Sequence, residues 1–372
     1  MQDNSRMTRP QSVLGWIGWV FWNRVEYRLR LAWRLAGFFI IFVFLMVALG
    51  MIQGLVLVLI GRVTPDDLMS SPAALQGGIS GPVVMTIVTL ITMLVAAWAF
   101  DRRRFRDFGF RLSKRWWQDL GFGLLLGAVI MLVIFLVEWG LGWIEVMPVW
   151  NSADMMQRLW PSLGSGLLLF LSVGFYEEAI SRGYLLKNFA EGFTTRWWKP
   201  QIAVLLAALL TSVAFGFAHA SNPNATIMSS VLISVAGLML AAGYVLTGEL
   251  AIPIGIHITW NFFQGYIFGF PVSGLDVGAS VFSIRQGGPE LWTGGRFGPE
   301  AGLIGLTAML ALTASIWAYV RARDGRSGLL AAVAEPELRH RKSVEMEELN
   351  GADLVDAVQL SQVDPPQQDP QA

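Results

Sequence analysis

The chain has 372 residues, of which 54% are hydrophobic and 15% are charged, and its mean hydropathy is +0.52. Ordinary soluble domains carry roughly 25% charged residues, so this composition excludes a soluble globular protein, a disordered chain and a nucleic-acid-binding protein. The net charge of +0 gives no field that would recruit an acidic partner, and a chain with no Cys has no disulfides, Cys-bound zinc, iron–sulfur clusters or thiol nucleophiles.

Eight apolar stretches are long enough to cross a bilayer, which takes ~20 mostly apolar residues per helix. Lipid cannot satisfy free backbone groups, and the stretches do not alternate as barrel strands do, so helices are expected. The predicted spans are roughly 37–60, 81–100, 120–143, 163–187, 201–219, 227–246, 251–270 and 301–320. We therefore predict an all-α, polytopic membrane protein with about eight transmembrane helices embedded in a lipid bilayer.

The basic residues are distributed very unevenly between the two sides of these spans. Segments 1–34, 101–117, 187–200, 248–250 and 321–372 share one side, and together they hold 22 of the 27 Lys and Arg residues. Loops rich in Lys and Arg remain in the cytoplasm. The sequence therefore predicts that both the N-terminus and the C-terminus are cytoplasmic, in an integral, multi-pass membrane protein.

Two segments flank the predicted bundle, which covers residues 35–322. Residues 1–34 are predicted to form a cytoplasmic segment rich in basic and aromatic residues. The pattern over 11–34 is typical either of an interfacial helix on an anionic leaflet or of a flank that obeys the positive-inside rule. Residues 323–372 are polar and rich in Asp, Glu, Gln and Pro, which predicts a disordered cytoplasmic tail. Within the bundle, residues 271–300 are predicted to form a Gly-rich outer loop.

Ionisable residues inside a span are costly and usually functional. Glu138 lies near the outer end of its span beside Trp139 and Trp143, and we expect it to snorkel to the interface. The other ionisable residues in the spans fall in three clusters that contain Glu177, Glu178, Arg182, His219 and His257.

The first cluster contains two adjacent acids and a base. Glu178 and Arg182 are four residues apart, so they share a helix face and can pair. Glu177 is displaced by ~100° around the helix and can point elsewhere. An ion-paired hinge is the structural alternative, although a second acid exceeds what a neutralising pair needs.

The second and third clusters each place a histidine in an apolar helix. His219 ends the segment that begins at Phe215, and it could simply cap its helix. His257 and Asn261 are four residues apart and therefore share one face, which could also be an interhelical hydrogen-bond pair. Because the chain has only 3 His, two of them in such positions favour a site.

These clusters contain the groups that a hydrolytic site needs. A carboxylate and a neutral imidazole can bind and deprotonate water, and His and Asn side chains can donate to a developing oxyanion. Glu177, His219, His257 and Asn261 provide these groups. Two His and one Glu, namely Glu177, His219 and His257, could instead hold Zn²⁺, although no tight zinc-binding spacing is present. No serine lies in a G-x-S-x-G motif.

At these clusters the sequence resembles the CAAX-protease and bacteriocin-processing (CPBP, or Abi) family of membrane proteases. The family motifs E-E-x-x-x-R, F-x-x-x-H and H-x-x-x-N are matched in order, at Glu177–Glu178–Arg182, Phe215–His219 and His257–Asn261. The resemblance covers a protease-like core at about 165–270. Ser181 departs from the pattern, because the family usually has a bulky residue just before the Arg.

The resemblance implies a catalytic role for all six polar motif residues. Glu177 and His219 would activate a water, and His257 and Asn261 would stabilise the oxyanion. Glu178 and Arg182 would hold Glu177 and the helix geometry. Family members have been called metalloproteases, but a metal-free glutamate mechanism also fits, so the only cofactor considered is zinc. The implied partner is a membrane-associated peptide or protein substrate; a prenylated CAAX substrate is not carried over.

Two other functions remain possible from the sequence. A catalytically idle family member could act as a membrane scaffold or an immunity partner. A small-solute or proton-coupled transporter could use the buried acids as a relay, although such a protein would favour inverted repeats, which the sequence does not show.

Overall fold

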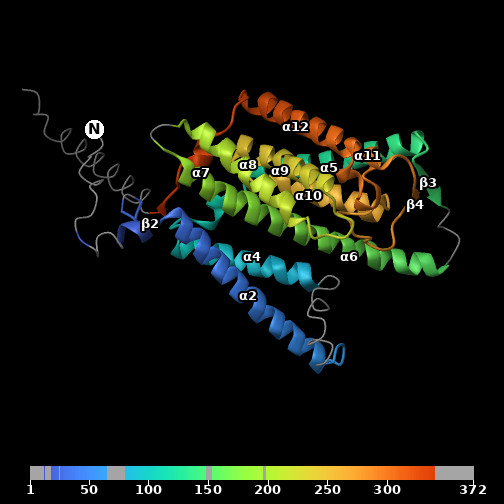
Figure 1. Cartoon of the computed structure of the whole chain (residues 1–372), viewed down its shortest axis with the longest axis horizontal. Helices are drawn as coiled ribbons and strands as arrows, with labels where there is room; N and C mark the ends of the chain where they lie inside the picture. The colour runs from blue at the N-terminus through green and yellow to red at the C-terminus, as the bar shows by residue number, and fades with distance from the viewer. Residues whose placement is uncertain are drawn as a thin grey trace, which may run out of the picture.

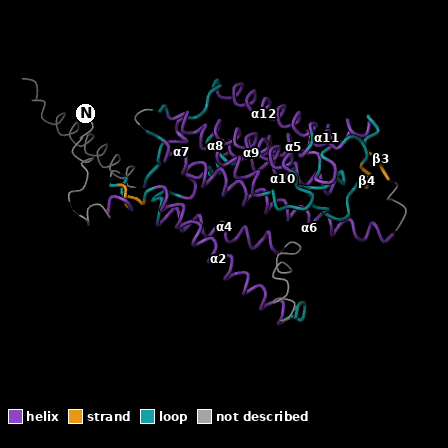
Figure 2. The backbone as a smooth tube through the Cα atoms, in the orientation of Figure 1, coloured by secondary structure: helices purple, strands orange, loops and turns teal. Residues whose placement is uncertain are grey.

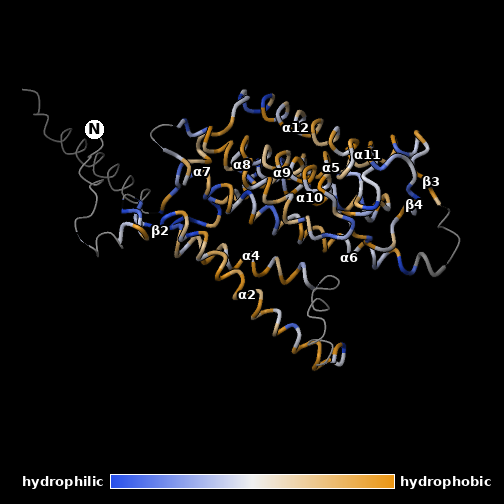
Figure 3. Tube along the Cα trace, viewed as in Figure 1, coloured by the Kyte–Doolittle hydropathy of each residue, from blue (hydrophilic) through white to orange (hydrophobic). Residues whose placement is uncertain are grey.

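The computed structural model describes residues 12, 18–24, 26–64, 80–147, 153–195 and 198–339. Long helices lie side by side over most of this length (Figure 1), and the backbone is mostly helical, with only short strands (Figure 2). The prediction of an all-α, polytopic membrane protein is confirmed. Figure 3 shows hydrophobic residues along the long helices and hydrophilic residues near β2 and α7.

The long helices are α2 (Leu31–Leu59), α4 (Ser80–Ala99), α5 (Lys114–Gly140), α6 (Ala153–Glu178), α8 (Pro200–Ala218), α9 (Ile227–Thr247), α10 (Ala251–Phe262) and α12 (Leu303–Asp324). Two π-helices continue α6 and α10, namely η4 (Ala179–Leu186) and η5 (Phe263–Ile267). The shorter helices are η3 (Phe105–Phe108), α7 (Lys187–Phe193), α11 (Glu290–Thr293), η6 (Gly295–Phe297), η7 (Pro299–Ala301) and η8 (Ala331–Ala334). Two antiparallel pairs of short strands join β1 (Trp22–Asn23) to β2 (Arg28–Leu29) and β3 (Ile144–Met147) to β4 (Ser283–Gln286).

Seven helices in the described residues are long and apolar enough to cross a membrane. The remaining predicted span, 251–270, forms the shorter helix α10 and its extension η5, which ends at Ile267, two residues before Gly269 with its positive φ of 74°. Nearly all of α10 is buried, and it packs against α5, α6 and α9. Because other helices surround it, α10 does not need the length that contact with lipid on all sides would require.

The two ends of the bundle differ in character. At one end, which we call the basic end, Arg28 and Arg103 both pair with Glu191 at distances of 2.8 and 2.6 Å, and Arg111 pairs with Glu249 at 2.9 Å. At the opposite end lie the β3–β4 pair and the segment 271–300, which we call the strap (Figure 1). The described N-terminal and C-terminal segments both lie at the basic end, as an even number of crossings requires.

The N-terminal segment differs from the predicted interfacial helix over 11–34. Residues 22–29 contain the β1–β2 pair, and α2 begins only at Leu31. Arg28 and Arg34 are buried and contact Glu191 and Asp101 instead of facing lipid headgroups. The helix prediction is therefore wrong for residues 22–29, and the buried arginines have acidic partners that the local sequence does not reveal. Residues 1–11 and 13–17 lie outside the described residues.

The C-terminal segment also differs from the predicted disorder over 323–372. Helix α12 continues to Asp324, and the following residues pack on the basic end. Val333 and Ala334 are buried, and the backbone N–H of Leu330 donates to the carbonyl of Val245 at 2.9 Å. Disorder is therefore wrong for 323–339, where apolar residues find a surface on the bundle; residues 340–372 lie outside the described part.

Helices α5 and α10 approach each other closely at glycines. A Cβ atom added to Gly255 would lie 2.7 Å from the carbonyl oxygen of Leu120 and 2.8 Å from the backbone nitrogen of Leu124. A Cβ added to Gly123 would lie 2.5 Å from the carbonyl oxygen of Ile252. Because backbone atoms cannot move aside as side chains do, these glycines fix the distance between the two helices.

We expect Gly255→Ala to lower the free energy of unfolding by about 1–3 kcal/mol, the usual cost of overpacking. It should also displace His257, a candidate site residue, because α10 carries that side chain. Gly121→Ala is the matched control on α5, since its Cβ would meet nothing within 4 Å. Thermal unfolding of the two purified variants in detergent tests this expectation, and equal midpoints would contradict it.

Candidate active site

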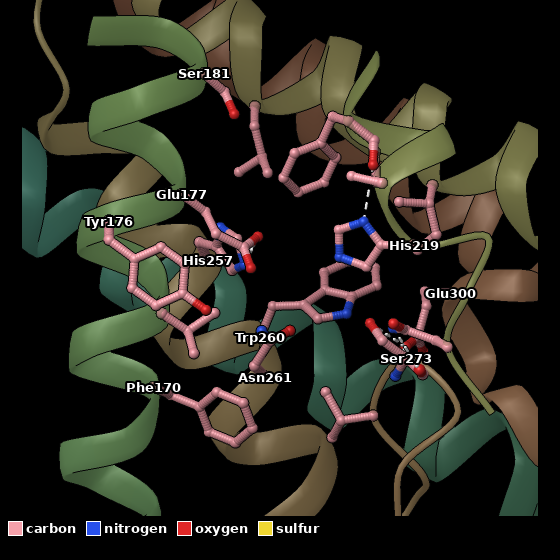
Figure 4. Close-up of a pocket in the computed structure, with 18 of the residues that line it drawn as sticks. Phe170, Tyr176, Glu177, Ser181, His219, His257, Trp260, Asn261, Ser273 and Glu300 are labelled. Atoms are coloured by element: carbon pink, nitrogen blue, oxygen red, sulfur yellow. Dashed lines mark hydrogen bonds and ion pairs between the residues drawn. The ribbon is translucent and has the colours of Figure 1, made fainter. Parts of the chain in front are cut away.

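A cavity of about 610 Å³ lies inside the bundle, and Glu177, His219, His257 and Asn261 all line it. They come from four places in the chain: the end of α6, the residue after α8, the middle of α10 and the next turn of α10. Figure 4 shows these side chains around one space, with Glu177 and His219 on opposite sides. The structure therefore brings together the four residues that the sequence proposed as a site.

Glu178 and Arg182 form the predicted pair, next in the chain to the cavity-lining residues Glu177 and Ser181. Arg182 Nη1 donates to Glu178 Oε1 at 2.8 Å, and Arg182 Nη2 donates to the carbonyl of Gly237 at 2.9 Å. Both side chains are almost fully buried. The wide turn of η4 begins immediately after Glu178, and such turns within helices are frequent at functional sites.

Glu178 also contacts His257, which the sequence did not predict. The Nδ1 atom of His257 lies 2.8 Å from Glu178 Oε1. Because a carboxylate paired with an arginine only accepts, Nδ1 carries the proton in this contact. The sequence expectation was that Glu178 holds Glu177; the structure instead places Glu178 where it fixes the orientation of the His257 ring.

The other nitrogen of His257 faces Glu177. Its Nε2 lies 3.7 Å from Glu177 Oε2, which is longer than a direct hydrogen bond. The Oε2 atom is buried and has no hydrogen-bond partner among the described residues. When His257 is neutral, both atoms offer lone pairs to the same space. A water molecule that donates to one of them would satisfy this arrangement.

His219 follows the last residue of α8, and a backbone carbonyl of that helix fixes the orientation of its ring. Its Nδ1 lies 2.8 Å from the carbonyl oxygen of Phe215, so Nδ1 carries the proton and Nε2 is the free acceptor. The Phe215 ring packs between the two histidines, with centroid distances of 4.8 Å to His219 and 6.2 Å to His257. The Arg182 guanidinium lies 4.6 Å from the centroid of the same ring. Phe215 therefore connects the three motifs physically.

Part of the chain is similar to a known protein family. Residues 159–263 match the family model described as type II CAAX prenyl endopeptidase, Rce1-like. The suspected membrane-protease family is confirmed over this segment. We call residues 159–263 the Rce1-like segment; it contains all six polar motif residues. No curated protein and no solved structure matches the chain.

Beyond the Rce1-like segment, the strap completes the cavity wall with residues that the sequence analysis missed. Glu300 lines the cavity and accepts a hydrogen bond from the backbone N–H of Ser273 at 2.6 Å and another from the side chain of Gln264. Asn222, three residues after His219, donates to the carbonyl of Ser273 at 3.0 Å. Glu300 thus connects the two ends of the strap and η5, and Asn222 connects the strap to the turn that follows His219. The only signal for Glu300 in the sequence is an acidic residue in a Gly-rich loop, outside the predicted spans.

Burial raises the pKa of Glu300 to about 7, above the ordinary value of 4.5. Between these values the folded chain holds a proton that the unfolded chain has lost, so the free energy of unfolding falls as pH rises from about 4.5 to about 7. Glu300→Gln should remove this contribution. The thermal midpoint of the variant, relative to the unaltered chain, should therefore rise with pH across this window. A difference that does not depend on pH would contradict the expectation.

Glu138 lies in a predicted span but is not among the residues that line the cavity. It is 0% exposed, and both carboxyl oxygens lack hydrogen-bond partners among the described residues. The expectation that it snorkels to the interface is wrong. After α5 the chain turns back, with the N–H of Trp143 donating to the Glu138 carbonyl at 2.8 Å, and β3 packs against this end of the helix.

The zinc alternative requires Glu177, His219 and His257 to bind one ion. The described residues contain no group of three His, Cys, Asp or Glu side chains placed to hold a metal ion. Glu177 and His257 approach each other, but Nδ1 of His257 is bonded to Glu178 and Nδ1 of His219 is bonded to a backbone carbonyl. Both contacts leave Nε2 of the ring free, as in most metal-binding histidines, so they do not argue against an ion. The observation against zinc is that no three suitable side chains among the described residues are placed to hold one ion.

Proposed function

We propose that the chain is an intramembrane endopeptidase that hydrolyses a peptide bond with a water activated by Glu177 and His219. The observation that carries this proposal is the convergence of one carboxylate, two imidazoles and one amide on a cavity within the bundle (Figure 4). The match of the Rce1-like segment to a protease family supports it.

In the proposed reaction, Glu177 and the free Nε2 of His219 hold and deprotonate the water, and its oxygen attacks the peptide carbonyl. The oxyanion receives a hydrogen bond from the side-chain amide of Asn261. His257 can add a second hydrogen bond only as an imidazolium, because its neutral Nε2 is an acceptor; Glu177 and Glu178 lie on either side of the ring and would pair with that cation. The proton taken from water then passes to the leaving nitrogen, which yields a carboxylic acid and an amine.

The rest of the cavity wall supports an apolar or lipid-proximal substrate segment. Helices α4 and α6 contribute the apolar residues Pro82, Met85, Leu169, Phe170 and Val173. An extended peptide with apolar side chains would remove this surface from water or lipid, whereas a small polar solute would not. We therefore propose a membrane-associated polypeptide as the substrate class.

The test is a comparison of membrane peptides from cells that express either the unaltered chain or Glu177→Gln. We expect new termini within or next to apolar segments only with the unaltered chain. Glu145→Gln is the matched control, because the Glu145 side chain is 64% exposed on β3, away from the cavity. Identical peptide sets for the unaltered chain and Glu177→Gln would reject proteolysis and favour a scaffold or transporter.

A chelator distinguishes the metal-free mechanism from the zinc mechanism. We expect cleavage by the purified protein in lipid to continue after prolonged treatment with a strong zinc chelator, because Glu177 and His219 alone hold the water in the proposed reaction. Lasting loss of activity that added zinc restores would contradict this prediction and would place an ion in the cavity.

A further inference from the structure

The cavity extends along the bundle from η4 to the strap. Its lining includes the last two turns of α8, from Thr211 to His219, and the early part of α9 at Ile233. It also includes the strap, from Val272 to Val277, and Glu300. The strap and the end of α8 that leads to it mark one limit of the cavity, and Ile180, Ser181 and Leu185 of η4 also line it, beyond Glu177 toward the basic end.

Packed side chains close the bundle between the cavity and the basic end. Phe108, Tyr184 and Leu250 belong to a large buried core on that side, and each is 0% exposed. The buried pairs of Arg28 and Arg103 with Glu191 cover this core at the basic end. A water-filled route from the basic end would have to cross both layers.

The strap end offers a route to the cavity. Leu275 lines the cavity and is 50% exposed, so the wall there borders the surface. Asn222, Ser273 and Glu300 give that part of the wall a polar character suited to water. Polar groups therefore continue from the candidate catalytic residues towards the strap.

The charge distribution indicates which side of the membrane this is. The sequence segments whose described parts lie at the basic end contain 22 of the 27 Lys and Arg residues, counted over the sequence, so the positive-inside rule places that end in the cytoplasm. The strap then lies on the opposite side of the membrane.

We propose that the cavity opens to water at the strap, on the non-cytoplasmic side, and that the substrate is a membrane-anchored polypeptide whose scissile bond lies in the outer half of the bilayer. The direction of opening stands on the packing and the charge distribution; the substrate class rests on the proposed proteolysis. A soluble cytoplasmic peptide would meet the basic end and would not reach Glu177.

Cysteine labelling tests the direction of opening without requiring activity. The chain has no Cys, so each variant carries a single thiol. Ser181→Cys places the thiol on a side chain that points into the cavity (Figure 4), and Leu275→Cys places it on the strap. Ser327→Cys places it on an exposed residue at the basic end. The full chain is expressed in sealed right-side-out membrane vesicles and treated with a membrane-impermeant maleimide.

We expect Ser181→Cys and Leu275→Cys to be labelled in intact vesicles, and Ser327→Cys only after permeabilisation. The proposal would be overturned if Ser181→Cys is labelled only from the side that labels Ser327→Cys, or from neither side. Labelling of Ser327→Cys in intact vesicles would also overturn it. None of these results depends on hydrolysis. If the cavity opens as proposed but no peptide is cleaved, proteolysis fails and the direction of opening stands.

Discussion

Glu177→Gln should lower peptide cleavage by about 10²-fold or more, because it removes the general base while keeping the size of the side chain. Oε2 of Glu177 has no hydrogen-bond partner among the described residues, so the amide breaks no hydrogen bond there. The variant should therefore fold normally and bind substrate, with the loss in turnover. The measurement is the cleavage rate of the purified variant in lipid, beside Glu145→Gln.

Two outcomes would count against this role of Glu177. Full activity of Glu177→Gln would show that another group activates the water. A large fall in thermal midpoint would mean that the loss of activity reports on folding. Glu145→Gln should leave both quantities unchanged, because its partner Arg285 is 67% exposed and such pairs contribute little.

Arg182→Ala should lower the free energy of unfolding by about 3–5 kcal/mol, the usual result of leaving one partner of a buried ion pair uncompensated. Glu178 is 0% exposed, and its Oε2 already has no hydrogen-bond partner in the described part of the chain. Activity should fall as well, because Glu178 orients His257. Unfolding in detergent measures the first effect and peptide cleavage the second.

A double substitution distinguishes the stability lost through an unpaired buried charge from the loss of peptide cleavage. Arg182→Met combined with Glu178→Gln removes both buried charges, so it should recover much of the lost stability. Activity should remain low, because a neutral Gln side chain cannot pair with the imidazolium of His257. Arg285→Ala is the control for a surface pair and should change stability by less than about 1 kcal/mol. Unchanged stability in Arg182→Ala would contradict the structural role of the pair.

Much of the fold followed from composition, because lipid imposes helices of a minimum length on any spanning segment. Where protein replaces lipid, that rule is lost: α10 is a shorter helix enclosed by its neighbours. The β1–β2 pair was missed because Arg28 and Arg34 take buried acidic partners from distant parts of the chain. A basic–aromatic sequence has the same appearance whether its arginines face phosphate or carboxylate groups.

The sequence also predicted only some of the contacts in the candidate site. Spacing within one helix predicted the Glu178–Arg182 pair, because residues four apart share a face. Spacing says nothing about contacts between helices, so the bond between Glu178 and His257 was not foreseen. Glu300 was missed because loop residues carry no periodic signal, although the strap brings it to the cavity.

The most direct test of the account follows a single turnover of a cleaved peptide by the purified chain in H₂¹⁸O, with the mass of the intact chain recorded at the same times. The account predicts that the new carboxyl terminus carries ¹⁸O, that the mass of the chain never changes, and that Glu177→Gln yields no product on this timescale. A chain that transiently gains the mass of the acyl fragment, or a Glu177→Gln variant that cleaves as fast as the unaltered chain, would contradict direct attack by a water activated at Glu177.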